Sequence, residues 1–90
     1  MKKGKTGMNQ SIRDLISRHG GLPVAIGDVA DDGDLYAAGL TSFASVQLML
    51  ALEEAFDMEF PDHLLNRKSF ASIEAIERTV ASILESRKVA

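Results

Sequence analysis

The segment GLTSFASVQLMLALEEAF, residues 39–56, predicts a helix from about Ser42 to Phe56 with Thr41 as its N-cap. At roughly 100° per residue, its larger side chains fall on two opposite sides. One set comprises Leu48, Met49, Leu52 and Phe56, with Ser45 among them. The other set comprises Phe43, Val46 and Leu50. A helix of a small bundle turns only one side to the core, so the second set needs its own explanation.

The first set continues to the end of the helix and includes its Phe56, so we assign it to the core. The second set begins beside Ser42 and is flanked by Glu53 and Glu54. An apolar patch with an acidic rim is typical of a docking surface. The alternative is a central helix that is buried all round. Periodicity alone leaves both interpretations open.

Outward from this helix, the chain predicts three more. Ser11 and Asp14 form a capping box, which starts a helix that ends at Gly20-Gly21. A short third helix is expected from Pro61, as its first residue, to about Asn66. A fourth should start near Ser69 or Ser72. The fold class is therefore all-α, a small four-helix bundle with three main helices and a short third one.

A long connection, residues 20–40, joins the first two main helices. Its apolar anchors are expected to be Leu22, Val24, Ile26, Leu35, Tyr36 and Leu40. Residues 1–8 are expected to form a flexible tail, 9–86 the folded domain and 87–90 a C-terminal tail. Nothing in this arrangement requires more than a monomer.

Composition narrows the function classes. The 90 residues include no Cys, which excludes disulfides, thiolate metal sites and cysteine nucleophiles. No apolar run approaches membrane-spanning length, and no apolar segment follows the basic N-terminus, so we expect a soluble cytoplasmic protein without membrane partners. Residues 19–66 hold nine acidic and no Lys or Arg side chains. This argues against nucleic acid as a partner and suits either a basic protein partner or a solvated acidic surface.

No catalytic or metal-binding residue set emerges. A calcium loop starting at Asp28 would place Gly39 where the bidentate Glu is needed. His19 and His63 lie in no metal-ligand spacing. No Gly-x-Ser-x-Gly elbow surrounds Ser42 or Ser45, and Ser45 is expected to be buried against the first or fourth helix. We therefore expect no enzyme.

Ser42 is the residue that decides between docking and burial. If Thr41 caps the helix, Ser42 occupies its first position and its hydroxyl is free. The unpaired N–H groups and positive dipole of a helix N-terminus favour a phosphate ester there. Gly39 would permit the tight turn that precedes it.

Gly39-Leu40-Thr41-Ser42-Phe43 resembles the Gly-x-Asp-Ser-Leu signature of acyl and peptidyl carrier proteins. Further similar segments are Asp34-Leu35-Tyr36, Gln47-Leu48, Leu52–Phe56, Phe60-Pro61-Asp62 and Ser69–Ile73. The resemblance implies a covalent 4′-phosphopantetheine arm on Ser42, attached from coenzyme A by a phosphopantetheinyl transferase. Thr41 stands where the family usually has Asp, Phe43 where it usually has Leu, and Gln47 where Glu is frequent.

A narrower resemblance covers LYAAGLTSFASVQLML, residues 35–50, and FPDHLLNRKSFASIEAI, residues 60–76. Both are similar to stand-alone aminoacyl carrier proteins, which are charged by amino acid:[carrier protein] ligases. The resemblance implies that the arm holds a small amino acid as a thioester and delivers it to a downstream acceptor enzyme. The residues expected to bind partners are Thr41, Phe43, Val46, Gln47, Leu50, Glu53 and Glu54.

Two alternatives remain open at this stage. One is an acyl carrier protein of a specialised fatty-acid or polyketide pathway, loaded by a different activating enzyme. The other is an unmodified helical adaptor, whose exposed helix face simply docks a partner. The adaptor needs no hydroxyl at Ser42, whereas both carriers require it.

Overall fold

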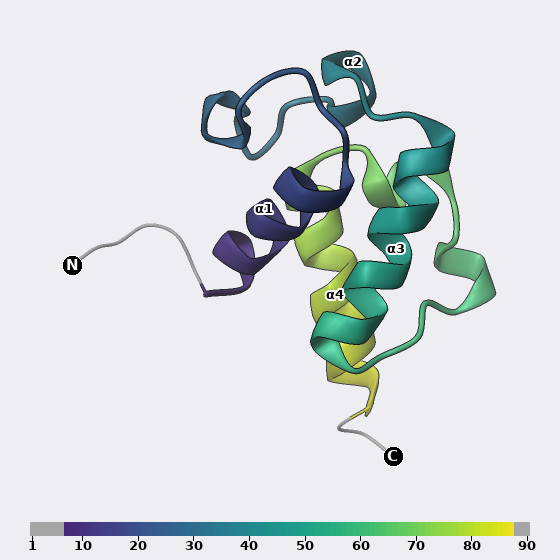
Figure 1. Ribbon diagram of the computed structural model, residues 1–90. Coiled ribbons are helices and arrows are strands. Elements are labelled where there is room, and N and C mark those ends of the chain that lie inside the picture. The colour runs from purple at the N-terminus through teal and green to yellow at the C-terminus, as the bar shows by residue number, and fades with distance from the viewer. Residues whose placement is uncertain (1–6, 88–90) are drawn as a thin grey trace.

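The structure is a computed structural model that describes residues 7–87. Its α-helices are α1 (Gly7–His19), α2 (Leu35–Ala38), α3 (Ser42–Phe56) and α4 (Ile73–Arg87). Three 3₁₀ turns complete it: η1 (Ile26–Asp28), η2 (Asp62–Leu64) and η3 (Arg67–Phe70). No strand occurs between residues 7 and 87. The predicted all-α, four-helix class is confirmed, with three long helices and one short helix (Figure 1).

The short elements differ from the expectation. The short α-helix is α2, which lies within the long connection, where no helix was predicted. The segment after Pro61 forms only a 3₁₀ turn, with Pro61 as its N-cap and not as its first helical residue. The fourth helix starts where Ser72 predicts, since the Ser72 hydroxyl accepts a hydrogen bond from the Ala75 N–H at 3.0 Å.

The start of α1 is a second correction. The helix begins at Gly7, four residues before the expected cap Ser11, which is exposed within the helix. The cause is tertiary: Asn9 is buried and donates to the Asp31 carboxylate at 3.1 Å, which holds the first turn in place. Residues 7–8 therefore belong to α1, while 1–6 and 88–90 of the expected tails lie outside the described residues.

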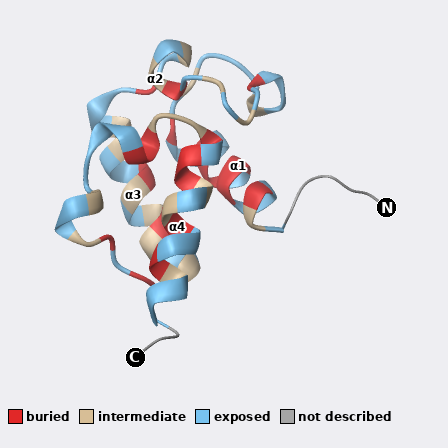
Figure 2. Cartoon of the chain, turned by 180° about the vertical axis from the view of Figure 1, so that it is seen from behind, coloured by how far each residue is buried: buried red, intermediate tan, exposed pale blue. Residues whose placement is uncertain are grey.

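α1 packs against both α3 and α4, and their facing sides make one core (Figure 2). Its fully buried side chains are Ile12, Ile16, Leu35, Leu48, Leu52, Ile73, Ile76 and Val80. Leu48 and Leu52 confirm the core face expected for α3, and Met49 and Phe56 pack half-buried against it. Of the expected loop anchors, Leu35 and Leu40 are buried and Leu22, Ile26 and Tyr36 half-buried, whereas Val24 is 46% exposed and anchors nothing.

A buried arginine joins the long connection to α1. The Arg13 guanidinium donates to the Asn9 side-chain oxygen at 3.1 Å, to the Ile26 carbonyl at 2.8 Å and to the Asp31 carboxylate at 2.6 Å. We call these contacts the Arg13 clasp. The Asp31 carbonyl in turn accepts from the Glu74 N–H of α4 at 2.9 Å. Asp31 thus links the connection to both α1 and α4.

The end of the connection directs the chain into α3. The Asp34 carboxylate caps α2 by accepting from the Tyr36 and Ala37 N–H groups at 2.9 and 3.3 Å. Gly39 then ends α2 with a φ of 126°, a conformation that side-chain-bearing residues rarely adopt. A Cβ at Gly39 would lie 2.7 Å from Cδ of Pro23. This crowded turn places the start of α3 beside α2, at one end of the bundle (Figure 1).

We predict that Arg13→Met lowers the free energy of unfolding by roughly 2–3 kcal/mol, because hydrogen bonds to charged groups contribute about 1.5–3 kcal/mol and Asp31 keeps partial access to water. The side chains of Arg13 and Asp31 are 9% and 41% exposed. In a domain of this size such a loss lowers Tm by roughly 10–20 °C. Urea unfolding followed by circular dichroism measures it.

The matched control is Arg78→Met, which breaks the exposed pair of Arg78 and Glu74, whose side chains are 69% and 55% exposed. It should cost at most about 0.5 kcal/mol. Equal losses in the two variants would contradict a special role for the Arg13 clasp.

Candidate functional site

The N-terminus of α3 presents Ser42 to solvent. Thr41 has extended backbone angles, and its hydroxyl accepts a hydrogen bond from the Ala44 N–H at 3.0 Å, which confirms it as the N-cap. The Ser45 N–H makes the first backbone bond of the helix, to the Thr41 carbonyl at 2.9 Å. The N–H groups of Ser42 and Phe43 therefore precede the helical ladder. Ser42 is exposed, and none of the described hydrogen bonds uses its hydroxyl.

The electrostatics of this helix end favour an anion. The first turn of α3 contains no acidic residue. The helix dipole and the two early N–H groups therefore meet no negative charge within that turn. A phosphate ester on the Ser42 hydroxyl would lie at the positive end of the helix.

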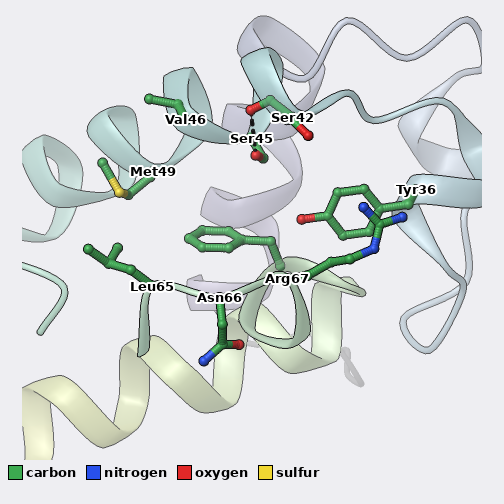
Figure 3. A pocket seen from close by; sticks show the side chains of 9 residues that line it. Tyr36, Ser42, Ser45, Val46, Met49, Leu65, Asn66 and Arg67 are labelled. Atoms are coloured by element: carbon green, nitrogen blue, oxygen red, sulfur yellow. Dashed lines mark hydrogen bonds between the residues drawn. The ribbon is translucent and has the colours of Figure 1, made fainter. Parts of the chain in front are cut away.

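A hollow of about 440 Å³ opens beside Ser42, between the first half of α3 and the segment 65–70 (Figure 3). Its floor includes Met49 and the buried Phe70. Ser45 also lines it, half-buried, and donates its hydroxyl hydrogen to the Ser42 carbonyl at 2.7 Å. The expectation that Ser45 packs against the first or fourth helix is therefore wrong, because residues three apart on a helix share a side and Ser45 follows Ser42.

Of the residues that line this hollow, only Ser42 and Val46 were predicted as part of the site, and two of the others contact each other. Tyr36 was expected only as a loop anchor, and Arg67 was not singled out. The Arg67 guanidinium carbon lies 3.7 Å from the centroid of the Tyr36 ring. One signal in the sequence was available: Arg67 is the first basic residue after the long acidic stretch 19–66.

The second apolar set of α3 is exposed. Phe43, Val46 and Leu50 are 75%, 50% and 51% exposed, so the interpretation of a helix buried all round is wrong. Gln47 and Glu54 are exposed as well. The five residues lie along one helix and together offer apolar area with polar neighbours. We call them the α3 docking face.

Glu53 was expected in the acidic rim of this face, but its carboxylate bonds within the chain. It is half-buried, and its carboxylate accepts from the Phe60 N–H at 3.0 Å, across the turn that ends α3. That turn depends on Asp57 in the left-handed conformation at φ 52°. The carboxylate of Glu53 thus bonds within the chain, and the exposed acids near Leu50 are Glu54, Asp57 and Glu59.

Comparison with known proteins agrees with this geometry. The profile of the family described as "Phosphopantetheine attachment site" matches residues 10–80. The chain belongs to this family of carrier proteins. Their cofactor is a covalently attached 4′-phosphopantetheine, so the resemblance inferred from the signature is confirmed, as are the carrier role and the cofactor.

The relatives are specific within this family. The aminoacyl carrier protein of Agrobacterium fabrum (strain C58 / ATCC 33970) is 63% identical over 83 residues, which cover 92% of this chain and 100% of the relative. A second relative, aminoacyl carrier protein 1 of Bradyrhizobium diazoefficiens, is 38% identical over 58 residues, which cover 64% of each chain.

A solved structure agrees with the relatives. It contains an engineered Bradyrhizobium japonicum glycine:[carrier protein] ligase complexed with the carrier protein from Agrobacterium tumefaciens and ATP. The matched chain superposes on this one with a TM-score of 0.83 and is 66% identical to it. The match covers 84% of this chain and 99% of the matched chain. These matches favour the carrier interpretation over the unmodified adaptor.

Two further findings concern residues 7–87. Their helices are too short or too polar to cross a lipid bilayer. Across the same residues, His, Asp and Glu side chains form no group of three that could hold a metal ion.

We predict that Thr41→Ala lowers the free energy of unfolding by about 1 kcal/mol, because the Ala44 N–H loses its acceptor. Thr41→Asp should retain the stability, since a carboxylate caps equally well and suits the helix dipole. Thermal unfolding of the three proteins measures both effects. A Thr41→Asp variant as unstable as Thr41→Ala would contradict the capping role.

Proposed function

We propose that Ser42 carries the 4′-phosphopantetheine arm as a phosphodiester on its hydroxyl oxygen. The observation that carries this proposal is the exposed, unbonded hydroxyl at the first residue of α3. The residues around it fit the group. The N–H groups of Ser42 and Phe43 precede the helical ladder and are available to a phosphate there, no acidic side chain of the first turn opposes it, and the adjacent hollow leaves room for the arm.

In this function the protein anchors the arm and presents its thiol to partner enzymes. The arm, when bound, supplies a thiol on which cargo is held as a thioester. Ser42 supplies the attachment oxygen, and the cap at Thr41 and the turn at Gly39 fix its position. No described side chain is assigned a bond-making step, so we propose a carrier that works with partner enzymes and is not itself an enzyme.

We further propose that the cargo is a small amino acid, with glycine as the first candidate. Support comes from the relatives, which are aminoacyl carrier proteins, and from the carrier chain seen with a glycine:[carrier protein] ligase. A further solved structure contains the Bradyrhizobium japonicum glycine:[carrier protein] ligase complexed with a glycylated carrier protein. Its matched chain is 31% identical to this one, with a TM-score of 0.72. The partners are then a phosphopantetheinyl transferase, such a ligase and a downstream acceptor enzyme, all acting in the cytoplasm.

The α3 docking face is the proposed contact with these partners. Phe43, Val46 and Leu50 supply apolar area next to Ser42, and Gln47 and Glu54 supply polar contacts. Thr41 adjoins them at the helix end. Among the residues expected to bind partners, Glu53 alone has its carboxylate bound within the chain. A small apolar face with acidic neighbours suits brief encounters with basic partner surfaces.

We predict that the native chain gains the mass of one phosphopantetheine when incubated with coenzyme A and a broad-specificity phosphopantetheinyl transferase, and that Ser42→Ala gains none. Ser45→Ala is the matched control, because it removes the other serine hydroxyl of the same hollow. Intact-mass spectrometry reads all three proteins. A gain by Ser42→Ala would place the arm elsewhere.

We also predict that Phe43→Ala and Leu50→Ala lower the kcat/KM of a glycine:[carrier protein] ligase for the modified chain by about tenfold each, because exposed apolar anchors contribute about 1.4 kcal/mol or more to such contacts. Stability should change by less than about 0.5 kcal/mol, since both side chains are already half-exposed or more. Val24→Ala, at an exposed apolar residue outside α3, is the control. Three equal effects would contradict a localised docking face.

A further inference from the structure

The hollow beside Ser42 contains one feature that the carrier function alone does not explain. Of the described residues that line it, Arg67 is the single basic one. Ser42 lies in the stretch 19–66, which contains no Lys or Arg. The fold therefore brings the Arg67 cation to a site whose neighbours in sequence carry none. In Figure 3 the Ser42 hydroxyl points towards the Tyr36 ring, and the Arg67 guanidinium lies over that ring.

We propose that Arg67, oriented by Tyr36, is a phosphate-binding residue that contacts the phosphodiester joining the arm to Ser42. This inference rests on the proposed attachment at Ser42. A phosphodiester carries one negative charge and two unesterified oxygens that accept hydrogen bonds. A guanidinium presents a planar set of N–H donors that matches such an anion.

The position of Tyr36 is fixed by its backbone. Its N–H donates to the Asp34 carboxylate at 2.9 Å, and its carbonyl accepts from the Gly39 N–H at 3.1 Å. The ring is half-buried against the core. The guanidinium carbon of Arg67 lies 3.7 Å from the ring centroid, a distance at which cation–π attraction contributes. Stacking uses the face of the guanidinium and leaves the N–H groups at its edge available.

The backbone of Arg67 is fixed from the other side. Arg67 begins η3, whose N-cap Asn66 accepts from the Ser69 N–H at 3.1 Å. At the end of the same turn Phe70 is buried and packs against Phe60, with the two rings tilted by 36° and their centroids 5.3 Å apart. None of the described hydrogen bonds or ion pairs uses the Arg67 guanidinium. A donor held in place from two sides, with its edge free, loses little conformational entropy when it binds an anion.

The test compares the apo chain with the chain modified on Ser42, using uniformly ¹⁵N-labelled protein and phosphorus NMR. We expect the Arg67 side-chain Nε–Hε signal to shift on modification. We expect Arg67→Gln to move the ³¹P resonance of the phosphodiester. Arg67→Gln should also abolish most of the salt dependence of the Tm difference between the modified and apo proteins. Arg67→Lys should restore part of that salt dependence, because it keeps the charge without the planar donors.

Lys68→Gln is the matched control, since it removes the same charge at the adjacent exposed position, outside the hollow. An exposed ion pair contributes up to about 1 kcal/mol, so Arg67→Gln should also slow modification by the transferase about two- to fivefold, and Lys68→Gln should not.

The outcomes separate this inference from the proposed function. If Ser42 is modified and the Arg67 signal does not shift, or if the two Gln variants behave alike, the phosphate-binding role is wrong and the carrier function stands. If no mass is gained on Ser42, both fail. A shift of the Arg67 signal together with a ³¹P change in Arg67→Gln alone supports both.

Discussion

The contacts of Arg13 are the constraint on which the rest of the structure depends. The connection between α1 and α3 is long and rich in Asp, and its apolar side chains, such as Leu35 and Leu40, reach the core only at intervals. Arg13 ties it to α1 through the Ile26 carbonyl and the Asp31 carboxylate, and the Asp31 carbonyl ties it to α4. Because the middle of the connection is then fixed, α2 and the turn at Gly39, which follow it in the chain, have a defined position. The position of this turn determines where α3 begins, and therefore the orientation of Ser42.

α3 divides two tasks between its two sides. Leu48 and Leu52 are fully buried and hold the helix in the bundle. Phe43 and Leu50 are exposed and lie outside the buried core, so the proposed partners would contact them without disturbing it. A carrier that must meet several enzymes in turn benefits from this separation, because association and release then leave the folded state unchanged.

Much of this could be predicted from local sequence. The span of α3, the cap at Thr41 and the exposed apolar face follow from side-chain periodicity and hydroxyl chemistry. What could not be predicted arises between distant segments. α1 starts early because Asn9 meets Asp31 across the fold. Glu53 leaves the expected rim because the chain reverses after Asp57 and presents the Phe60 N–H.

The same physical limit applies to the candidate site. Ser42 could be proposed as the attachment residue from the sequence because that proposal depends on its immediate neighbours, Gly39, Thr41 and Phe43. The stacking of Arg67 on Tyr36 joins the connection to the segment before α4 and has no periodic signal in either. The position of Ser45 in the hollow could not be predicted either, because segment 65–70, which forms the facing side, is distant in sequence.

The close approach of Gly39 to Pro23 bears on how such carriers diverge and how they can be re-engineered. A side chain at residue 39 would meet the proline ring at 2.7 Å, so this glycine is required by a contact within the chain itself. Neighbouring positions such as Thr41 and Phe43 carry no comparable steric restriction from the ring. Libraries meant to redirect the carrier to new enzymes should therefore vary those positions and keep residue 39 as glycine, whose φ of 126° would strain any side chain.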